Sequence, residues 1–328
     1  MTVLVTGVAG FIGMHVAEAL LARGDRVLGV DSLTPYYDVR LKRARLARLE
    51  GRTGFEFLPL DVADRDAMLA LAEDRAGEVT RIVHLAAQPG VRYSLVDPFA
   101  YVDANVMGHL VVLEAARRLR RPEHVVYASS SSVYGGNESL PFRETDRVDH
   151  PVSLYAATKR AAELISESYA HLFALPQTGL RFFTVYGPWG RPDMAPWLFA
   201  EAILEGRPIT LYEGGRLRRD FTYVEDIVAG VLGCLDRPPE GGAPRLLNIG
   251  NHRSEEVRRF LSLLEQALGR KAVVVEAPRP PTDVPETFAD IDAIATLAGY
   301  APRTPIEAGI PRFAAWFRGW RENLGKGG

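Results

Sequence analysis

TVLVTGVAGFIGMHV, residues 2–16, is the stretch that decides the fold. A short apolar run leads into glycines at positions 7, 10 and 13, and apolar residues at helical spacing follow. Gly7 permits a tight turn, Gly10 lets the backbone approach a diphosphate, and Gly13 allows helix and strand to pack closely. The helix N-terminus would offer unpaired N–H groups to phosphate oxygens. A glycine triad alone is weak evidence, but placed between a strand and a helix it predicts a dinucleotide site.

The first half of the chain alternates β-branched runs with segments of helical periodicity. The predicted strands are 2–7, 26–31, 55–61, 81–87 and 124–130, and the predicted helices are 12–23 and 100–119. This alternation predicts an α/β fold, a doubly wound parallel sheet of the Rossmann type with helices on both faces. A helix over 153–173 and one further strand over 178–187 continue the pattern.

Gly- and Pro-rich connections interrupt the pattern in the second half of the chain. We expect them to build a smaller C-terminal α/β substrate lobe, whose loops are free to form a pocket. The predicted division is a Rossmann domain over 1–180, with a returning segment at about 215–250, and a substrate-binding lobe mainly over 181–328.

Acidic and small residues stand at the ends of the predicted strands. Asp31 ends the second strand, 18 residues after Gly13, where a carboxylate would accept hydrogen bonds from the adenosine ribose. A carboxylate repels a 2′-phosphate, which favours NAD over NADP. Residues 61–62 and 85–87 follow the third and fourth strands, at the sheet edge where open α/β sheets bind ligands.

The segment PVSLYAATKRAAEL carries a candidate catalytic pair. Tyr155 and Lys159 are one helical turn apart and project from the same face. Tyrosine is a poor base at neutral pH, but a neighbouring ammonium, the charge of NAD⁺ and a helix N-terminus all favour its phenolate. Ser130, in the run ASSSSVYG at the end of a strand, lies 25 residues earlier and could relay a proton to Tyr155. The order of these motifs makes a chance match improbable.

Composition excludes several other classes of protein. The net charge of −2 over 328 residues shows no excess of positive charge that would favour binding to nucleic acid or an anionic membrane. Cys234 is the single cysteine, so no internal disulfide can form and a reducing compartment fits. The seven histidines show no paired metal-ligand spacing. We expect a soluble, cytoplasmic enzyme that needs no metal.

These motifs resemble those of the extended short-chain dehydrogenase/reductases that act on nucleotide sugars, and among them the UDP-glucuronate 4-epimerases. The resemblance covers nearly the whole chain. The stretches that carry it are YYDVRLKRARL (36–46), HLAAQPGVRYS (84–94), YASSSSVYG (127–135), PVSLYAATK (151–159), LRFFTVYGPWGRPDM (180–194) and RRDFTYVEDI (218–227).

The resemblance implies C4 epimerisation of UDP-glucuronate through a transient 4-keto sugar and permanently bound NAD. Tyr155 would be the base, Ser130 its partner and Lys159 the cation that orients the cofactor. The implied cofactor-binding residues are Gly7, Gly10, Phe11, Ile12, Gly13, Asp31, Ser32, Asp61, Val62, Leu85, Ala86, Ala87, Asn105, Ser129, Tyr155, Lys159 and Phe183. The implied substrate-binding residues are Arg92, Ser130, Ser131, Ser132, Tyr155, Thr184, Arg191, Tyr212, Arg219 and Asp283, with Arg219 at the UDP diphosphate and Arg191 at the sugar carboxylate.

Three points stay open at this stage. A UDP-glucose or UDP-pentose 4-epimerase would share the same catalytic set, and an NAD(H)-binding sensor would need only the cofactor site. Related enzymes resemble Pro-x-Gln-Pro-Gly-Asp-Val where this chain has PRPPTDV, so Pro280 and Thr282 could alter the loop that presents Asp283. The resemblance also implies a homodimer that pairs helices around 95–120 and 153–173, with the apolar side chains Val102, Val106, Leu110, Leu164 and Ile165 as candidates for the contact.

Overall fold

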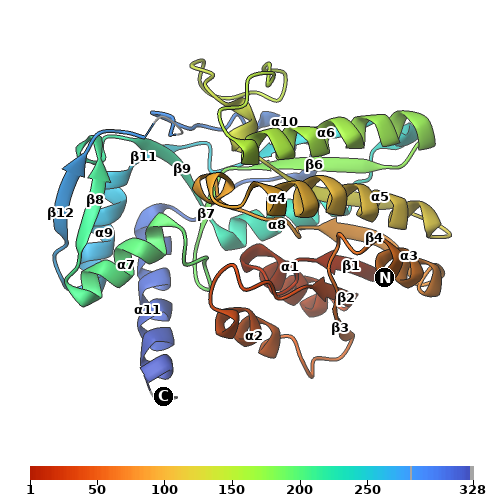
Figure 1. Ribbon diagram of the computed structural model, residues 1–328, viewed down its shortest axis with the longest axis horizontal. Helices are drawn as coiled ribbons and strands as arrows, with labels where there is room; N and C mark the ends of the chain where they lie inside the picture. The colour runs from red at the N-terminus through yellow and green to blue at the C-terminus, as the bar shows by residue number, and fades with distance from the viewer. Residues whose placement is uncertain (281–282, 326–328) are drawn as a thin grey trace.

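The computed structural model describes residues 1–280 and 283–325 and places the glycine-rich stretch at the centre of a seven-stranded sheet (Figure 1). The strands are β1 (Thr2–Thr6), β2 (Arg26–Asp31), β3 (Phe55–Pro59), β4 (Val79–His84), β5 (His124–Ser130), β6 (Gln177–Phe182) and β10 (Arg245–Ile249). All are parallel, in the order β10-β6-β5-β4-β1-β2-β3. The winding reverses between β1 and β4, so the predicted doubly wound fold is confirmed, with its ligand crevice at the carboxyl ends of these strands.

Helices cover both faces of this sheet. One layer holds α3 (Arg65–Asp74), α5 (Gly108–Arg118) and α6 (Leu154–Phe173), and the other holds α1 (Phe11–Ala22), α8 (Val224–Leu235) and α10 (Asp292–Ala298). Alternate residues of a strand point to opposite faces. In β1, Val3 and Val5 pack into the layer of α1 and α8, whereas Leu4 packs into the layer of α3 and α5.

A smaller lobe lies beside the open end of the sheet, at the left of Figure 1. It contains α7 (Ala195–Glu205), α9 (Val257–Leu268), α11 (Ile306–Gly325) and the parallel pair β8 (Pro208–Tyr212) and β12 (Val273–Ala277). A three-stranded sheet of β7 (Thr184–Tyr186), β9 (Arg218–Tyr223) and β11 (Ser254–Glu256) adjoins it. Because α8 and β10 belong to the main sheet and its helical layers, we propose the division at 1–180, 181–328 and the returning segment 215–250 for this chain.

Two predicted elements are wrong in detail. The strand expected over 178–187 divides into β6 and β7, which lie in different sheets. Between them the backbone N–H of Phe183 donates to the carbonyl of Ile249, so the chain leaves the main sheet at this residue. The helix expected over 100–119 consists of α4 (Pro98–Tyr101), a π-helical segment (Val102–Met107) and α5. Helical periodicity alone does not distinguish such a wide turn, which is frequent at functional sites.

The remaining elements are short. They are α2 (Val39–Ala47) and the 3₁₀ turns Arg92–Leu95, Ser131–Tyr134, Glu213–Gly215 and Glu240–Gly242. None of the helices in the described part of the chain is long and apolar enough to cross a membrane.

Helix α6 is fixed on one face of the main sheet, over β5 and β6, by its N-cap and by a buried ion pair. The side chain of Ser153 caps its N-terminus by accepting from the N–H of Ala156 at 3.1 Å. Further along, the carboxylate of Glu163 accepts from Arg181 of β6 at 2.8 and 2.9 Å, and both side chains are buried. Cap and ion pair together hold the first turns of α6 against the end of β5.

Candidate active site

A cavity of about 1120 Å³ runs along the carboxyl ends of the parallel strands and into the smaller lobe. It exceeds the size of most pockets for a single small ligand, so it has room for two ligands end to end. All the predicted site residues line it except one. Asn105 is buried behind the wall, where it bonds to the backbone of Gln88 and to the hydroxyl of Thr158. It supports Gln88, which does line the cavity.

The glycine-rich loop forms one end of the cavity and leaves no space for side chains. Gly7 has a φ of +72°, and a Cβ there would lie 2.7 Å from the backbone nitrogen of Ala86. A Cβ at Gly13 would collide with the carbonyl oxygen of Gly7. Helix α1 begins at Phe11, and Gly10 caps it without a side-chain bond, so the first N–H groups of the helix are free for an anion. This cradle fits a dinucleotide diphosphate.

Asp31 is held in place at the end of β2. Its carboxylate accepts from the backbone N–H of Ala9 at 3.1 Å and from that of Leu33 at 2.8 Å. Lys42 of α2 also lines this part of the cavity and donates to Thr34 at 3.0 Å. Burial lowers the pKa of Lys42, and the charge of Asp31 opposes that shift. Sequence reasoning missed Lys42, although it is one of only four lysines in the chain.

The predicted catalytic residues meet at the middle of the cavity. Lys159 is fully buried and donates to the carbonyl of Ala128 at 3.0 Å. Burial lowers the pKa of Lys159 to about 8, and Glu163 opposes the shift. Burial raises the pKa of Tyr155, whereas the Ser130 hydroxyl and the Arg191 guanidinium lower it. Beside this set, Ser129 donates to Glu163 at 2.6 Å, which anchors the serine run to α6.

The serine run turns directly after β5. The hydroxyl of Ser130 lies 3.2 Å from that of Ser132 and accepts from the Ser132 backbone N–H at the same distance. Ser131, Thr184 at the start of β7, and Phe183 also line the cavity. Hydroxyl groups therefore surround the space in front of Tyr155.

Arginines gather at the far end of the cavity around one carboxylate. Arg92 lies 3.3 Å from Asp283, and Arg219 lies 4.0 Å from it. Arg92 also stacks over the ring of Tyr212, 5.1 Å from its centroid. Burial lowers the pKa of Arg219, and the nearby charges of Arg279 and Arg92 add to that shift. The single carboxylate of Asp283 does not neutralise the charge of these arginines, so this end of the cavity attracts anions. Thr282, whose effect on this loop was in question, lies outside the described residues.

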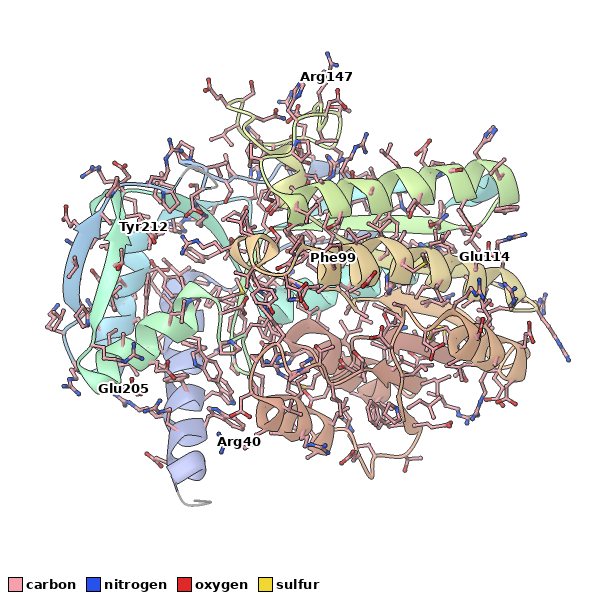
Figure 2. The ribbon with its side chains drawn as sticks, in the orientation of Figure 1. Arg40, Phe99, Glu114, Arg147, Glu205 and Tyr212 are labelled. Carbon is pink, nitrogen blue, oxygen red and sulfur yellow. The ribbon has the colours of Figure 1, made fainter. Side chains whose placement is uncertain are left out.

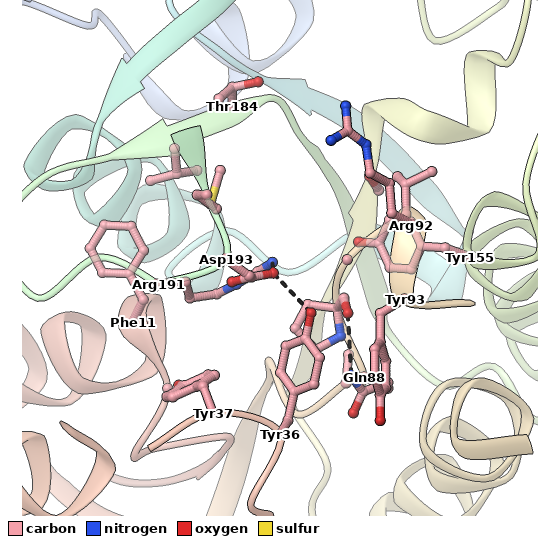
Figure 3. A pocket seen from close by; sticks show the side chains of 18 of the residues that line it. Phe11, Tyr36, Tyr37, Gln88, Arg92, Tyr93, Tyr155, Thr184, Arg191 and Asp193 are labelled. Atoms are coloured by element: carbon pink, nitrogen blue, oxygen red, sulfur yellow. Dashed lines mark hydrogen bonds and ion pairs between the residues drawn. The ribbon is translucent and has the colours of Figure 1, made fainter. Parts of the chain in front are cut away.

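A third cluster joins the glycine-proline loop before α7 to the loop after β2. Arg191 donates Nε and Nη2 to Asp193 at 2.9 and 2.6 Å, and Tyr36 donates to the same carboxylate at 3.0 Å (Figure 3). Nη1 of Arg191 has no hydrogen-bond partner among the residues that the structure describes, so it can bind a ligand. Tyr36 and Asp193 fall inside the motifs that carry the family resemblance, but sequence reasoning assigned them no role.

A family model described as the NAD dependent epimerase/dehydratase family matches residues 3–250. The chain belongs to this family. A probable UDP-glucuronate 4-epimerase from Rhizobium meliloti (strain 1021) is 46% identical, over 97% of both chains. Among solved structures, UDP-glucuronic acid 4-epimerase from Bacillus cereus, in complex with UDP-glucuronic acid and NAD, is 33% identical with a TM-score of 0.90, covering 98% of this chain and 100% of that one. UDP-glucose 4-epimerase from Thermotoga maritima, with UDP-glucose, is 28% identical with a TM-score of 0.87, covering 98% and 100%.

The position of Asp31 generates a prediction about cofactor choice. Asp31→Asn removes the charge that repels a 2′-phosphate and replaces one acceptor oxygen by a donor. We expect the affinity for NAD to fall about tenfold and the preference for NAD over NADP to shrink by more than that, because a hydrogen bond to a charged group contributes about 1.5–3 kcal/mol. Calorimetric titration with NAD and with NADP measures the ratio of the two dissociation constants.

Asp61→Asn is the matched control, because Asp61 lines the same cavity and its carboxylate accepts, among the described residues, from the backbone N–H of Ala63 alone, at 2.9 Å. It should leave the ratio of the two affinities unchanged. An unchanged ratio in Asp31→Asn would show that another residue selects the dinucleotide.

Proposed function

We propose that this protein interconverts UDP-glucuronate and UDP-galacturonate by epimerisation at C4, with NAD as its bound cofactor. One observation carries the proposal. A single cavity joins a diphosphate cradle at one end to an arginine cluster at the other, and Tyr155, Lys159 and Ser130 lie between them. A dinucleotide and a nucleotide sugar would therefore meet end to end at the catalytic tyrosine. The R. meliloti and B. cereus relatives support this choice of reaction.

The chain's own groups handle the proton in this reaction. Tyr155 accepts the proton of the C4 hydroxyl, with Ser130 between them as a relay, and the buried Lys159 ammonium favours the phenolate. Bound NAD supplies the acceptor and later the donor of the C4 hydride. Arg92 and Arg219 hold the diphosphate while the 4-keto sugar rotates about its link to it. After this rotation the other face of C4 is turned toward the cofactor. Tyr155 returns the proton to the C4 oxygen as C4 regains its hydride on that face, so no net oxidation occurs.

The serine run distinguishes this reaction from those of related enzymes. In family members that eliminate water the corresponding run resembles Thr-Asp-Glu, and in those that decarboxylate UDP-glucuronate it resembles Thr-Ser-Glu. Here the residues are Ser130, Ser131 and Ser132. The hydroxyl of Ser130 bonds to that of Ser132 and accepts from the Ser132 backbone N–H. Epimerisation needs no carboxylate at this point, so the run favours it.

Recognition of the sugar carboxylate is assigned to Arg191, with Ser131, Ser132 and Thr184 as further donors. Asp193 accepts hydrogen bonds from Nε and Nη2 of Arg191, and neither bond uses Nη1. Burial raises the pKa of Tyr155 and the charge of Arg191 opposes that rise, which supports a role for Arg191 beside the reacting sugar. Arg92 is a second candidate for the carboxylate, although its contact with Asp283 at the far end of the cavity favours a role at the diphosphate.

Two alternatives would use the same cavity. A UDP-glucose or UDP-pentose 4-epimerase would leave Arg191 without a carboxylate to bind. An NAD(H)-binding sensor would have no use for Tyr155, Lys159 and Ser130 together. We propose a cytoplasmic location, for which the single buried Cys234 is the supporting observation.

Incubation of the purified protein with UDP-glucuronate, UDP-glucose or UDP-xylose, without added reductant, tests the function. We expect UDP-galacturonate as the only product, identified by NMR. Conversion of only a neutral sugar would keep the chemistry and overturn the role of Arg191. A pentose product from UDP-glucuronate would mean decarboxylation and would contradict the argument from the serine run.

The variant Arg191→Gln tests whether Arg191 binds the sugar carboxylate. Loss of a charge-assisted bond to the carboxylate should raise the KM for UDP-glucuronate by about 10- to 100-fold. The matched control is Arg207→Gln, since Arg207 lines the cavity but pairs with Glu201 and Glu205 at the surface. If Arg191→Gln turned over UDP-glucuronate as the control does, another residue would bind the carboxylate.

We also propose that the protein forms a homodimer through α4, the π-helical segment and α6. Nine of the fourteen exposed large apolar side chains among the described residues lie in or beside these elements, namely Leu95, Val96, Phe99, Val102, Met107, Val152, Leu164, Leu172 and Phe173. Phe99 is 78% exposed (Figure 2). Of the side chains predicted for the contact, Val102 and Leu164 are exposed, whereas Val106, Leu110 and Ile165 are partly buried. Such a patch is typical of an interface.

Phe99→Glu should therefore convert a dimer into a monomer, because it buries a charge in an apolar contact. Light scattering after gel filtration should give twice the chain mass of 36.1 kDa for the wild type and 36.1 kDa for the variant. Val275→Glu, an exposed apolar position on β12, is the control and should remain dimeric. A monomeric wild type would refute the proposal.

A further inference from the structure

Arg45 of α2 is a fully buried cation that the catalytic scheme does not use. Its side chain is 0% exposed. Nη1 donates to the carbonyl of Ala9 at 3.1 Å and to the hydroxyl of Tyr37 at 2.6 Å. Nε and Nη2 donate to the carbonyl of Trp189 at 3.1 and 2.7 Å, and Nη2 also donates to that of Gly190 at 3.0 Å. One guanidinium thus joins two loops that are about 180 residues apart in sequence.

The charge of Arg45 has no carboxylate in contact with it among the residues that the structure describes. The other large buried arginine, Arg181, forms an ion pair with Glu163. Carbonyl dipoles satisfy the donors of Arg45 but leave its positive charge uncompensated, and Asp31 acts on it only through space. An uncompensated buried charge costs several kcal/mol, and a guanidinium does not lose its proton. The contact with the carbonyl of Ala9 sets this charge against the glycine-rich loop, where the negative charge of a bound diphosphate would act on it through space.

Both loops that Arg45 joins belong to the cavity. Ala9 lies inside the glycine-rich loop, and its N–H bonds to Asp31. Trp189 has a φ of +64°, a left-handed conformation that is unfavourable for a large side chain, and its carbonyl accepts two of the bonds from Arg45. Arg191 follows two residues later. The geometry at Trp189 therefore depends on Arg45, and the position of Arg191 depends on that geometry.

We propose that Arg45 couples the cofactor site to the substrate loop, so that NAD and the UDP-sugar each tighten the binding of the other. The diphosphate of the cofactor stabilises the guanidinium beside Ala9, and the fixed guanidinium holds the carbonyls of Trp189 and Gly190 in the conformation that presents Arg191. Coupling of this kind is reciprocal by thermodynamic necessity. The identity of the UDP-sugar in this inference rests on the proposed function.

The test measures how fast bound NAD exchanges with excess radiolabelled NAD, with and without UDP-glucuronate. Every protein carries Tyr155→Phe, so that the sugar binds without turnover. In that background we expect UDP-glucuronate to slow exchange by about 5- to 150-fold, the usual range for coupled sites. Adding Arg45→Met should reduce the effect to less than about twofold, and Arg45→Lys, which keeps the charge but not the planar fork, should give an intermediate value.

Arg43→Met, at an exposed position of the same helix, is the matched control and should preserve the full effect. If Arg45→Met and Arg45→Lys both kept the full effect and only lowered the melting temperature, Arg45 would be structural and the inference would be wrong. If UDP-glucuronate did not slow NAD exchange in the Tyr155→Phe protein that keeps Arg45, the inference would also be wrong. Turnover of UDP-glucuronate by the wild type tests the proposed function independently of the coupling through Arg45. If the wild type converts UDP-glucuronate while NAD exchange is insensitive to Arg45, this inference fails and the proposed function stands.

Discussion

A side chain at Gly13 would collide with the carbonyl oxygen of Gly7, and one at Gly7 would lie 2.7 Å from the backbone nitrogen of Ala86. The close contact of these three segments is the constraint on which the rest of the structure depends. It brings the N-terminus of α1 to the switch point between β1 and β4, and so it creates the diphosphate cradle. Every other functional group is placed relative to that cradle, either by the neighbouring strand ends or by the loops that pack against it.

Positively charged side chains with little exposure to solvent are the second feature that defines the cavity. Lys159 and Arg45 are buried and Arg191 is partly buried. Each is held in a different way. Lys159 has a backbone carbonyl and the nearby charge of Glu163, Arg191 has the carboxylate of Asp193, and Arg45 has backbone carbonyls and the hydroxyl of Tyr37. Buried cations are costly when unpaired, which gives the cavity a strong preference for anionic ligands. A dinucleotide and a nucleotide sugar each bring a diphosphate, and a uronate brings one further negative charge. The arrangement thus suits anionic ligands. Burial raises the pKa of Tyr155, and the charge of Arg191 opposes that rise.

Sequence reasoning reached the architecture and most of the cavity because their signals are local. The glycine triad, the acidic strand end at Asp31 and the helical spacing of Tyr155 and Lys159 each follow from a few neighbouring residues. It failed at Phe183, where a tertiary hydrogen bond to Ile249 divides one apolar run between two sheets. It also missed Lys42, Tyr36 and Asp193, whose places in the cavity depend on how the loop after β2 meets a loop more than 150 residues away. Asn105, which was expected at the cofactor, lies behind the cavity wall and bonds to the backbone of Gln88, a position that no local pattern in the sequence indicates.

The central claim is that the hydrogen at C4 leaves the sugar as hydride and returns to the same carbon. The most direct measurement uses UDP-glucuronate labelled with deuterium at C4 and ordinary water as solvent, with the product resolved by NMR. The account predicts that UDP-galacturonate retains the deuterium at C4, because the hydride stays on the bound cofactor between the two half-reactions. Replacement of the label by hydrogen from water would contradict it, since C4 would then exchange a proton with solvent rather than a hydride with NAD.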